Sequence, residues 1–358
     1  MEDTYSVANG GHFAAVFDGH GGAGVSGMLR DHVHRLYSKA LTQRHHEEAH
    51  RSTLDEMQVD DDVNDNDNDE VNNNNENDNN DNNKKSIPSI QSHTAAIRGA
   101  FSRIERESLR HDHFEYQGST AVAVIVHVGE DGNRTLISAN VGDSRAILCR
   151  GKKAVDLTRD HKPSDEREKA RIRSMGEDVQ WDPYGEIYRV KDLSLSRAIG
   201  DRFAKPVVSS EAEIDSLPVN DDEDEFFVSS RLCYFFWCAC AFLIVTSFIS
   251  NLDGRKKKSH FSIIIMSLAL SAIKTNIIKK LLASDGLWDV MTSQEVVDFV
   301  HEMLECPTQS VKTKKGKIIL TPEFRRRKMA RFVAHEALER GSADNVCVIL
   351  VWLKKDKM

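Results

Sequence analysis

The sequence predicts a layered sandwich of α-helices and antiparallel β-strands rather than an alternating βαβ array. Short apolar runs that are typical of strands come in clusters, the clearest at residues 120–128, 135–141 and 144–149. Longer segments with apolar residues at helical spacing lie between these clusters. The chain has 358 residues, of which 40% are hydrophobic, so it can bury a core of substantial size.

In the N-terminal third, residues 11–17 predict a strand and residues 25–41 predict a helix. Residues 45–86 are rich in Asp and Asn and hold few apolar residues, so we expect a disordered insert there. An EF-hand is not expected in this tract, because the acidic run has no Gly for the sharp turn of such a loop. A helix near residues 93–110 follows.

The remaining elements are marked by turn and capping residues. Gly142-Asp143 separates the second and third of the strands named above, which predicts a β-hairpin. A helix is expected to start at Pro163-Ser164 and to end near Gly176. Two more helices are expected to start at Thr292 or Ser293 and at Thr321-Pro322, the second ending at Gly341.

Three aspartates each lie at the edge of a strand-like apolar run: Asp18, Asp285 and Asp344. Strand ends hold side chains rigidly, and carboxylates gathered there suit hard divalent cations such as Mg²⁺ or Mn²⁺. Two such ions can activate a water molecule and hold a phosphoryl group. The pattern therefore indicates metal-dependent phosphoester hydrolysis. An ordinary turn would explain either Asp-Gly pair taken alone, and the repetition favours the metal site.

The segment from Gly19 to Gly24 reads G-x-G-x-x-G between a strand and a helix, as in dinucleotide-binding proteins. The rest of that unit is missing, because no second strand ends in an acidic residue for a ribose. A sharp turn beside the metal site explains these glycines better.

Charge and cysteine usage limit the other classes of function. The net charge of −8 argues against nonspecific binding of nucleic acid. The six cysteines lack zinc-finger spacing and no signal peptide opens the chain, so a cytoplasmic or nuclear protein with reduced thiols is expected. Basic runs at 312–317 and 325–328 fit a nuclear address, a dock for acidic substrates or plain solvated surface.

The chain resembles the type 2C family of metal-dependent Ser/Thr protein phosphatases. Motifs that occur in the family's order and span almost the whole chain carry this resemblance: Met1-Glu2-Asp3, Val16-Phe17-Asp18-Gly19-His20-Gly21-Gly22, Gly118-Ser119-Thr120-Ala121, Asn140-Val141-Gly142-Asp143-Ser144-Arg145, Leu195-Ser196-Arg197-Ala198-Ile199-Gly200-Asp201, Leu282-Ala283-Ser284-Asp285-Gly286-Leu287-Trp288-Asp289 and Gly341-Ser342-Ala343-Asp344-Asn345. Together they are specific, although no single one would be.

The resemblance implies an α+β fold, a four-layer sandwich of two antiparallel β-sheets flanked by α-helices, in one phosphatase domain over residues 1–354. It implies two Mg²⁺ or Mn²⁺ ions at one end of the sandwich. Asp18 would bridge both ions. Glu2 and the carbonyl of Gly19 would complete the site of one ion, and Asp285 and Asp344 that of the other.

The resemblance also implies roles for residues around the two ions. His20 would be the general acid, and Asp143 and Asp289 match a weaker third metal site, although Asp289 is equally explained as a carboxylate at a helix start. Asp201 is expected to fix a turn rather than to bind metal. Arg197 would lie near the end of a segment that covers the substrate in the family.

Two departures from the family pattern bear on activity. The chain starts at the Met-Glu-Asp motif, so we expect a truncated N-terminus that lacks the family's first strand and its phosphate-contacting arginine. Residues 229–281 read as an apolar insert, because joining Val228 to Leu282 would restore one strand leading to Asp285.

This insert has an apolar run from Leu232 to Ile249, a basic patch at 255–258 and a shorter apolar run from Phe261 to Ile273. It is open to three interpretations: a transmembrane hairpin through 232–273 that would associate the protein with membranes, a buried helix pair, or a translated intron. A hairpin would interrupt the pairing of a core strand, so the translated intron is favoured.

Taken together, the motifs predict a monomeric protein Ser/Thr phosphatase that acts on phosphorylated proteins through a metal-activated water. The alternative is a pseudophosphatase that binds phosphoproteins without turnover, because of the missing arginine and the split strand.

Overall fold

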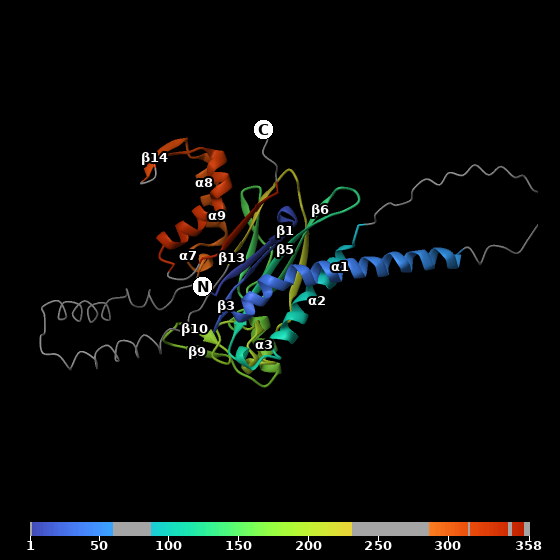
Figure 1. Cartoon of the computed structure of the whole chain (residues 1–358). Coiled ribbons are helices and arrows are strands. Elements are labelled where there is room, and N and C mark those ends of the chain that lie inside the picture. Colours follow the sequence, from blue (N-terminus) through green and yellow to red (C-terminus); the bar gives the residue numbers. More distant parts are fainter. Residues whose placement is uncertain (1, 60–86, 231–285, 314–315, 343–345, 354–358) are drawn as a thin grey trace, which may run out of the picture.

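The computed structural model describes residues 2–59, 87–230, 286–313, 316–342 and 346–353. Two antiparallel sheets pack face to face, and a pair of helices covers the outer face of each (Figure 1). The predicted α+β sandwich of four layers is therefore confirmed.

The first sheet has five strands, and the second has four. In spatial order the first consists of β1 (Thr4–Ala8), β2 (Phe13–Phe17), β5 (Ala121–Val128), β6 (Arg134–Val141) and β12 (Glu213–Pro218). The second consists of β16 (Val348–Trp352), β13 (Asp224–Ser230), β7 (Arg145–Arg150) and β8 (Lys153–Asp156).

The central strands β2, β5 and β7 are mostly apolar because both of their faces are buried. In β13, Phe226 and Val228 face one pair of helices, whereas Phe227 between them faces the first sheet. In β2, Phe13 and Phe17 likewise face the helices of the first sheet, and Val16 faces the second sheet.

Helices α1 (Gly24–Val59) and α2 (Ile90–Ser108) cover the first sheet, and α8 (Ser293–Glu305) and α9 (Pro322–Glu339) cover the second. Their starts match the sequence signals. Thr292 forms a capping box with Glu295, and Thr321 caps α9, which has Pro at its first position.

The first helix extends beyond the prediction. Residues 45–59 were expected to begin the disordered insert, but they continue α1 to Val59. Residues 42–59 contain no Gly or Pro and are rich in helix-forming residues, and Gln43 donates a hydrogen bond to Glu47 one turn away (3.0 Å). The rest of the predicted insert, residues 60–86, lies outside the described residues.

The predicted hairpin at Gly142-Asp143 is wrong. β6 pairs with β5 and β12, whereas β7 pairs with β13 and β8, so residues 142–144 carry the chain from one sheet to the other. The backbone N–H and C=O of Gly142 both bond to His161 instead of closing a hairpin. This crossing places Asp143 at the end of the sandwich.

Smaller elements gather at that same end. Strands β3 (Gly19–His20), β4 (Gly118–Ser119) and β11 (Ile199–Gly200) form a short sheet there. Next to it are α3 (Glu166–Ser174), β9 (Gln180–Asp182) and β10 (Ile187–Arg189), seen at the bottom of Figure 1. The other short elements are η1 (Asn9–Gly11), η3 (Asp112–Phe114), η4 (Arg202–Ala204), α7 (Leu287–Val290), β14 (Gln309–Thr313) and β15 (Gly316–Leu320).

No helix in the described ranges is long and apolar enough to cross a membrane. The first two residues of the predicted insert, Ser229 and Ser230, belong to β13 and pair with both neighbouring strands. The other residues of 229–281 lie outside the described part of the chain, as does the possible membrane segment 232–273.

Candidate active site

Asp18 lies directly after β2 and is buried, with 2% of its surface exposed. Its carbonyl accepts a hydrogen bond from the N–H of Thr120 (2.8 Å), and its own N–H donates to Oγ1 of Thr120 (3.3 Å). The same Oγ1 lies 2.6 Å from Oγ of Ser144. Hydrogen bonds therefore join the end of the first sheet to the turn that carries Asp143.

Glu2 lies against the loop that follows Asp18. Its Oε2 accepts a hydrogen bond from the N–H of Gly22 (3.3 Å), and its carbonyl accepts one from Oγ of Ser26 (2.5 Å). A Cβ atom on Gly19 would lie 2.6 Å from the Glu2 carbonyl oxygen. The two backbones can approach this closely only because residue 19 is glycine.

His20 pairs with Asp201, whose Oδ2 lies 2.7 Å from Nε2 of the histidine. Asp201 is fully buried and has a φ of 49°, so it also forms the turn that the sequence predicts. Its role as the partner of His20 was missed, because nothing in the local sequence connects positions so far apart.

The charge around His20 is negative. Burial alone would lower the pKa of His20, but the charge and hydrogen bond of Asp201, with smaller contributions from Asp143 and Glu2, raise it. Each of these three carboxylates therefore lies near enough to His20 to raise its pKa.

Asp143 is buried, and its Oδ1 has no hydrogen-bond partner among the described residues. Burial raises the pKa of this carboxyl to about 7, and Asp160 adds to the increase, whereas Lys162 and His20 oppose it. A buried carboxylate oxygen with no donor from the described part of the chain is suited to a cation.

Asp289 lies in α7 and is exposed. It shares two charged neighbours with Asp143, namely Asp160 and Lys162. Asp160, which the sequence motifs did not single out, is held by the guanidinium of Arg145 through contacts of 2.9 and 2.7 Å.

Two of the predicted metal ligands, Asp285 and Asp344, lie outside the described residues, so their part in the site stays a prediction. Asp3, which follows Glu2 in the sequence, is buried. Among the predicted residues that are described, contacts and charge interactions link Glu2, Asp18, Gly19, His20 and Asp143.

The protein phosphatase 2C family model matches residues 67–229 and 280–346, more than half of the chain. The chain belongs to the protein phosphatase 2C family. The two matched stretches are separated by residues 230–279, which fall within the predicted insert.

Individual members of the phosphatase 2C family agree with this assignment. The probable protein phosphatase 2C 6 of Oryza sativa subsp. japonica is 28% identical over 98% of this chain and 58% of its own length. Protein phosphatase 2C 16 of Arabidopsis thaliana is also 28% identical, over 97% of this chain and 53% of its own length. The chain thus spans little more than half the length of these relatives.

The crystal structure of serine-threonine phosphatase 2C from Toxoplasma gondii has the same fold. Its TM-score is 0.55 and its sequence is 18% identical, and the match covers 96% of this chain and 84% of that one.

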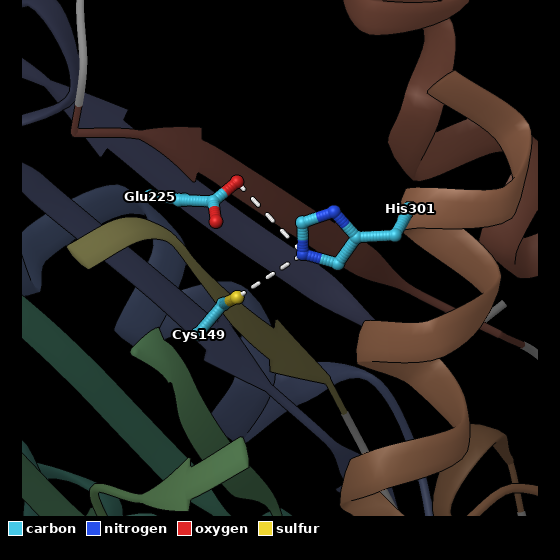
Figure 2. Close-up of side chains that lie close together, drawn as sticks. All are labelled: Cys149, Glu225 and His301. Atoms are coloured by element: carbon cyan, nitrogen blue, oxygen red, sulfur yellow. Dashed lines mark hydrogen bonds and ion pairs between the residues drawn. The ribbon is translucent and has the colours of Figure 1, made fainter. Parts of the chain in front are cut away.

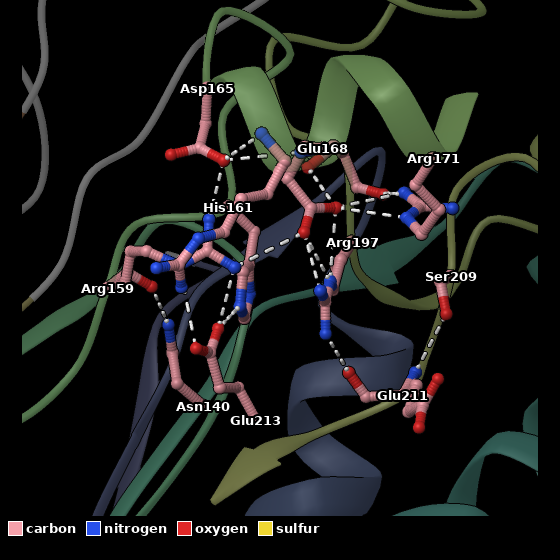
Figure 3. A network of polar contacts seen from close by, with 12 residues as sticks. Asn140, Arg159, His161, Asp165, Glu168, Arg171, Arg197, Ser209, Glu211 and Glu213 are labelled. Atoms are coloured by element: carbon pink, nitrogen blue, oxygen red, sulfur yellow. Dashed lines mark hydrogen bonds and ion pairs between the residues drawn. The ribbon is translucent and has the colours of Figure 1, made fainter. Parts of the chain in front are cut away.

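In this phosphatase 2C domain, a network of charged side chains anchors α3 beside the site (Figure 3). Glu168 is buried and accepts hydrogen bonds from Arg171 (3.0 and 3.1 Å) and Arg197 (3.0 and 3.1 Å). His161 contacts Glu213 through Nε2 (2.8 Å) and accepts from the N–H of Gly142 through Nδ1 (3.1 Å). Arg159 joins the two parts, since it donates to Glu168 (3.4 Å) and to Glu213 (2.8 Å). The network therefore reaches the turn that holds Asp143, and Arg197 is a structural part of it.

Proposed function

We propose that this chain hydrolyses phosphoserine and phosphothreonine in proteins, with two Mg²⁺ or Mn²⁺ ions. The grouping of Glu2, Asp18, His20 and Asp143 at one end of the sandwich carries the proposal. The donors are carboxylate and carbonyl oxygens, which these hard cations prefer. When bound, the ions would lower the pKa of a water molecule, so that hydroxide is available to attack phosphorus.

Oxygen atoms of the protein would hold the ions, and a protein side chain would donate a proton to the leaving group. Glu2, Asp18 and the Gly19 carbonyl are the proposed ligands in the described part of the chain, with Asp285 and Asp344 from the resemblance. Asp143 and Asp289 are proposed for a weaker third ion.

His20 is the proposed general acid for the leaving Ser or Thr oxygen. Since its Nε2 faces the carboxylate of Asp201, Nδ1 is the nitrogen left to give up a proton. The raised pKa of His20 favours the protonated form that this role needs.

A cavity of about 620 Å³ opens beside Asp160, and its lining combines four basic side chains with five carboxylates: Arg145, Arg159, Lys162 and Arg167 with Asp156, Asp160, Asp165, Glu213 and Asp215. Basic side chains attract phosphate and acidic peptide segments. Arg145 and Arg159 already pair with carboxylates of this lining, so membership of the protein phosphatase 2C family, rather than this cavity, supports a phosphorylated protein as the substrate.

Hydrolysis of a phosphothreonine peptide with and without Mn²⁺ tests the proposal. We expect Mn²⁺-dependent phosphate release that Asp18→Ala reduces to background. The matched control is Asp298→Ala, which removes an exposed carboxylate on α8 and should keep full activity. Full activity of Asp18→Ala would contradict the proposed mechanism.

An equilibrium Mn²⁺ titration, combined with the activity assay, distinguishes the enzyme from a pseudophosphatase. Mn²⁺ binding that depends on Asp18, without any phosphate release, would favour a phosphoprotein-binding module. Both binding and turnover would favour the enzyme.

A further inference from the structure

A second group of metal-binding side chains lies where α8 packs on the second sheet (Figure 2). Cys149 comes from β7, Glu225 from β13 and His301 from α8. Nε2 of His301 is 3.5 Å from Sγ of Cys149 and 3.8 Å from Oε2 of Glu225. All three donor atoms lie within 4.8 Å of one another.

An irregularity in β13 brings Glu225 into this group. The register of β13 against β7 shifts between Asp224 and Phe226, which leaves Glu225 as the extra residue of a β-bulge. In a regular strand Glu225 would point to the opposite face from Phe226, which pairs with Cys149. The bulge redirects the carboxylate toward the face that carries the thiol and the imidazole.

The arrangement does not fit a Cys-His-Glu catalytic triad. In a triad the base uses one ring nitrogen for the nucleophile and the other for the carboxylate that orients it. Here the sulfur and the carboxylate both approach the same nitrogen, Nε2 of His301. Three different donor atoms that all lie this close to one another could hold one metal ion.

The distance between Cys149 and His301 and the donor types fit zinc. With Zn–S near 2.3 Å and Zn–N near 2.0 Å, a tetrahedral ion separates its sulfur and nitrogen ligands by about 3.5 Å. Cys149 and His301 are 3.5 Å apart before any ion is considered. Thiolate, imidazole and carboxylate together select a borderline-soft divalent cation rather than Mg²⁺. We propose that Cys149, Glu225 and His301 form a Zn²⁺ site, with a water molecule as the fourth ligand.

This site is separate from the candidate active site. Asp143 precedes β7 and Cys149 lies near the far end of that strand, so about 20 Å of extended chain separates them. Cys149 is buried, but the side chains of His301 and Glu225 are 13% and 28% exposed, so an ion can enter from the Glu225 side. Bound zinc would tie α8 to β7 and β13.

One basic side chain lies near the entrance. Lys152 pairs with Glu305 at 3.0 Å, and its pKa is raised first by that hydrogen bond and more weakly by Glu225 and Cys149. Its ammonium group therefore has a carboxylate partner of its own outside the three ligands.

Cobalt binding to the full chain tests the proposal, because a thiolate ligand gives Co²⁺ a charge-transfer absorption that oxygen ligands do not give. Saturating Mg²⁺ is added first to occupy carboxylate sites. We expect the band in the wild type, its loss in Cys149→Ser and His301→Gln, and its displacement by one equivalent of Zn²⁺. The matched controls are Cys306→Ser at the end of the same helix and His335→Gln on the exposed side of α9, and both should keep the band.

A thermal melt in Zn²⁺ and in a chelator provides the second readout, with Glu225→Gln as the variant least able to disturb the core. We expect Zn²⁺ to raise the Tm of the wild type and of Cys306→Ser, but not that of Glu225→Gln. The proposal is overturned if the wild type shows no thiolate band, or if Cys149→Ser keeps the band. It is equally overturned if Zn²⁺ raises the Tm of Glu225→Gln as much as that of the wild type.

Discussion

Gly118 controls how closely His20 and Asp201 approach each other. A Cβ atom at this position would lie 2.1 Å from Oδ2 of Asp201 and 2.4 Å from Nε2 of His20. We therefore predict that Gly118→Ala separates the pair and lowers kcat by about 100-fold or more, the usual contribution of a general acid. Steady-state hydrolysis of the phosphothreonine peptide measures the effect.

The matched control is Gly99→Ala in α2, where the new methyl group would meet nothing within 4 Å. Alanine is the better helix former, so this variant should be as active as the wild type and more stable by about 0.5–1 kcal/mol. Equal kcat values for the two variants would show that the His20–Asp201 contact does not matter for turnover.

At the scale of residues, the sequence predicts side chains that lie in motifs but not the partners that the fold brings to them. Glu2, Asp18 and His20 each stand in a recognisable motif and are linked in the structure. The pairing of His20 with Asp201 joins positions 181 apart, which no local pattern encodes. The same applies to Glu225, since only the pairing of β13 with β7 reveals its bulge.

At the scale of elements, the stability of α3 depends on the buried carboxylate of Glu168. Burial would raise its pKa, but hydrogen bonds and charges from Arg197 and Arg171 lower it from 4.5 to about 2. Since the folded pKa is the lower one, its contribution to stability is fully present above pH 4.5 and is lost as the pH falls toward about 2.

We predict that Glu168→Gln lowers the free energy of unfolding by about 3–5 kcal/mol at neutral pH, because it leaves partly buried arginines without their buried counter-charge. Urea unfolding measures this, and the difference from the wild type should shrink at about pH 3, because Glu168 is then protonated in the unfolded wild-type chain. The control is Glu166→Gln on the same helix, 87% exposed, which should change stability by less than about 0.5 kcal/mol. A similar small change in both variants would contradict the prediction.

Capping signals predicted the helix starts, whereas the turn signal at Gly142 did not predict how the strands pair. The starts of α8 and α9 are local events, in which Thr292 and Thr321 bond to backbone within one turn, so sequence reveals them. The prediction of a hairpin was wrong because Gly142 indicates only that the chain turns, and not which sheet the next strand joins. Strands with two apolar faces fit either sheet equally well.

At the scale of the whole molecule, β13 ends beside the turn that carries Asp143 from one sheet to the other. Ser230, its last residue, pairs with Arg145 of β7 and with Val348 of β16. In a variant deleted for 229–281, Leu282 and Ala283 would occupy the positions of Ser229 and Ser230. The same antiparallel register, continued for two residues, would then put Asp285 opposite Asp143.

We therefore predict that the variant deleted for 229–281 hydrolyses the phosphothreonine peptide with Mn²⁺ faster than the intact chain. A deletion that is one residue longer, 229–282, is the matched control, because a shift of one residue turns Asp285 to the other face of the sheet and should remove the activity. Equal activity of both deletions would show that the register of this strand does not position Asp285. Equal activity of the intact chain and the shorter deletion would mean that the insert is a tolerated element, and the transmembrane hairpin would then be the interpretation to test.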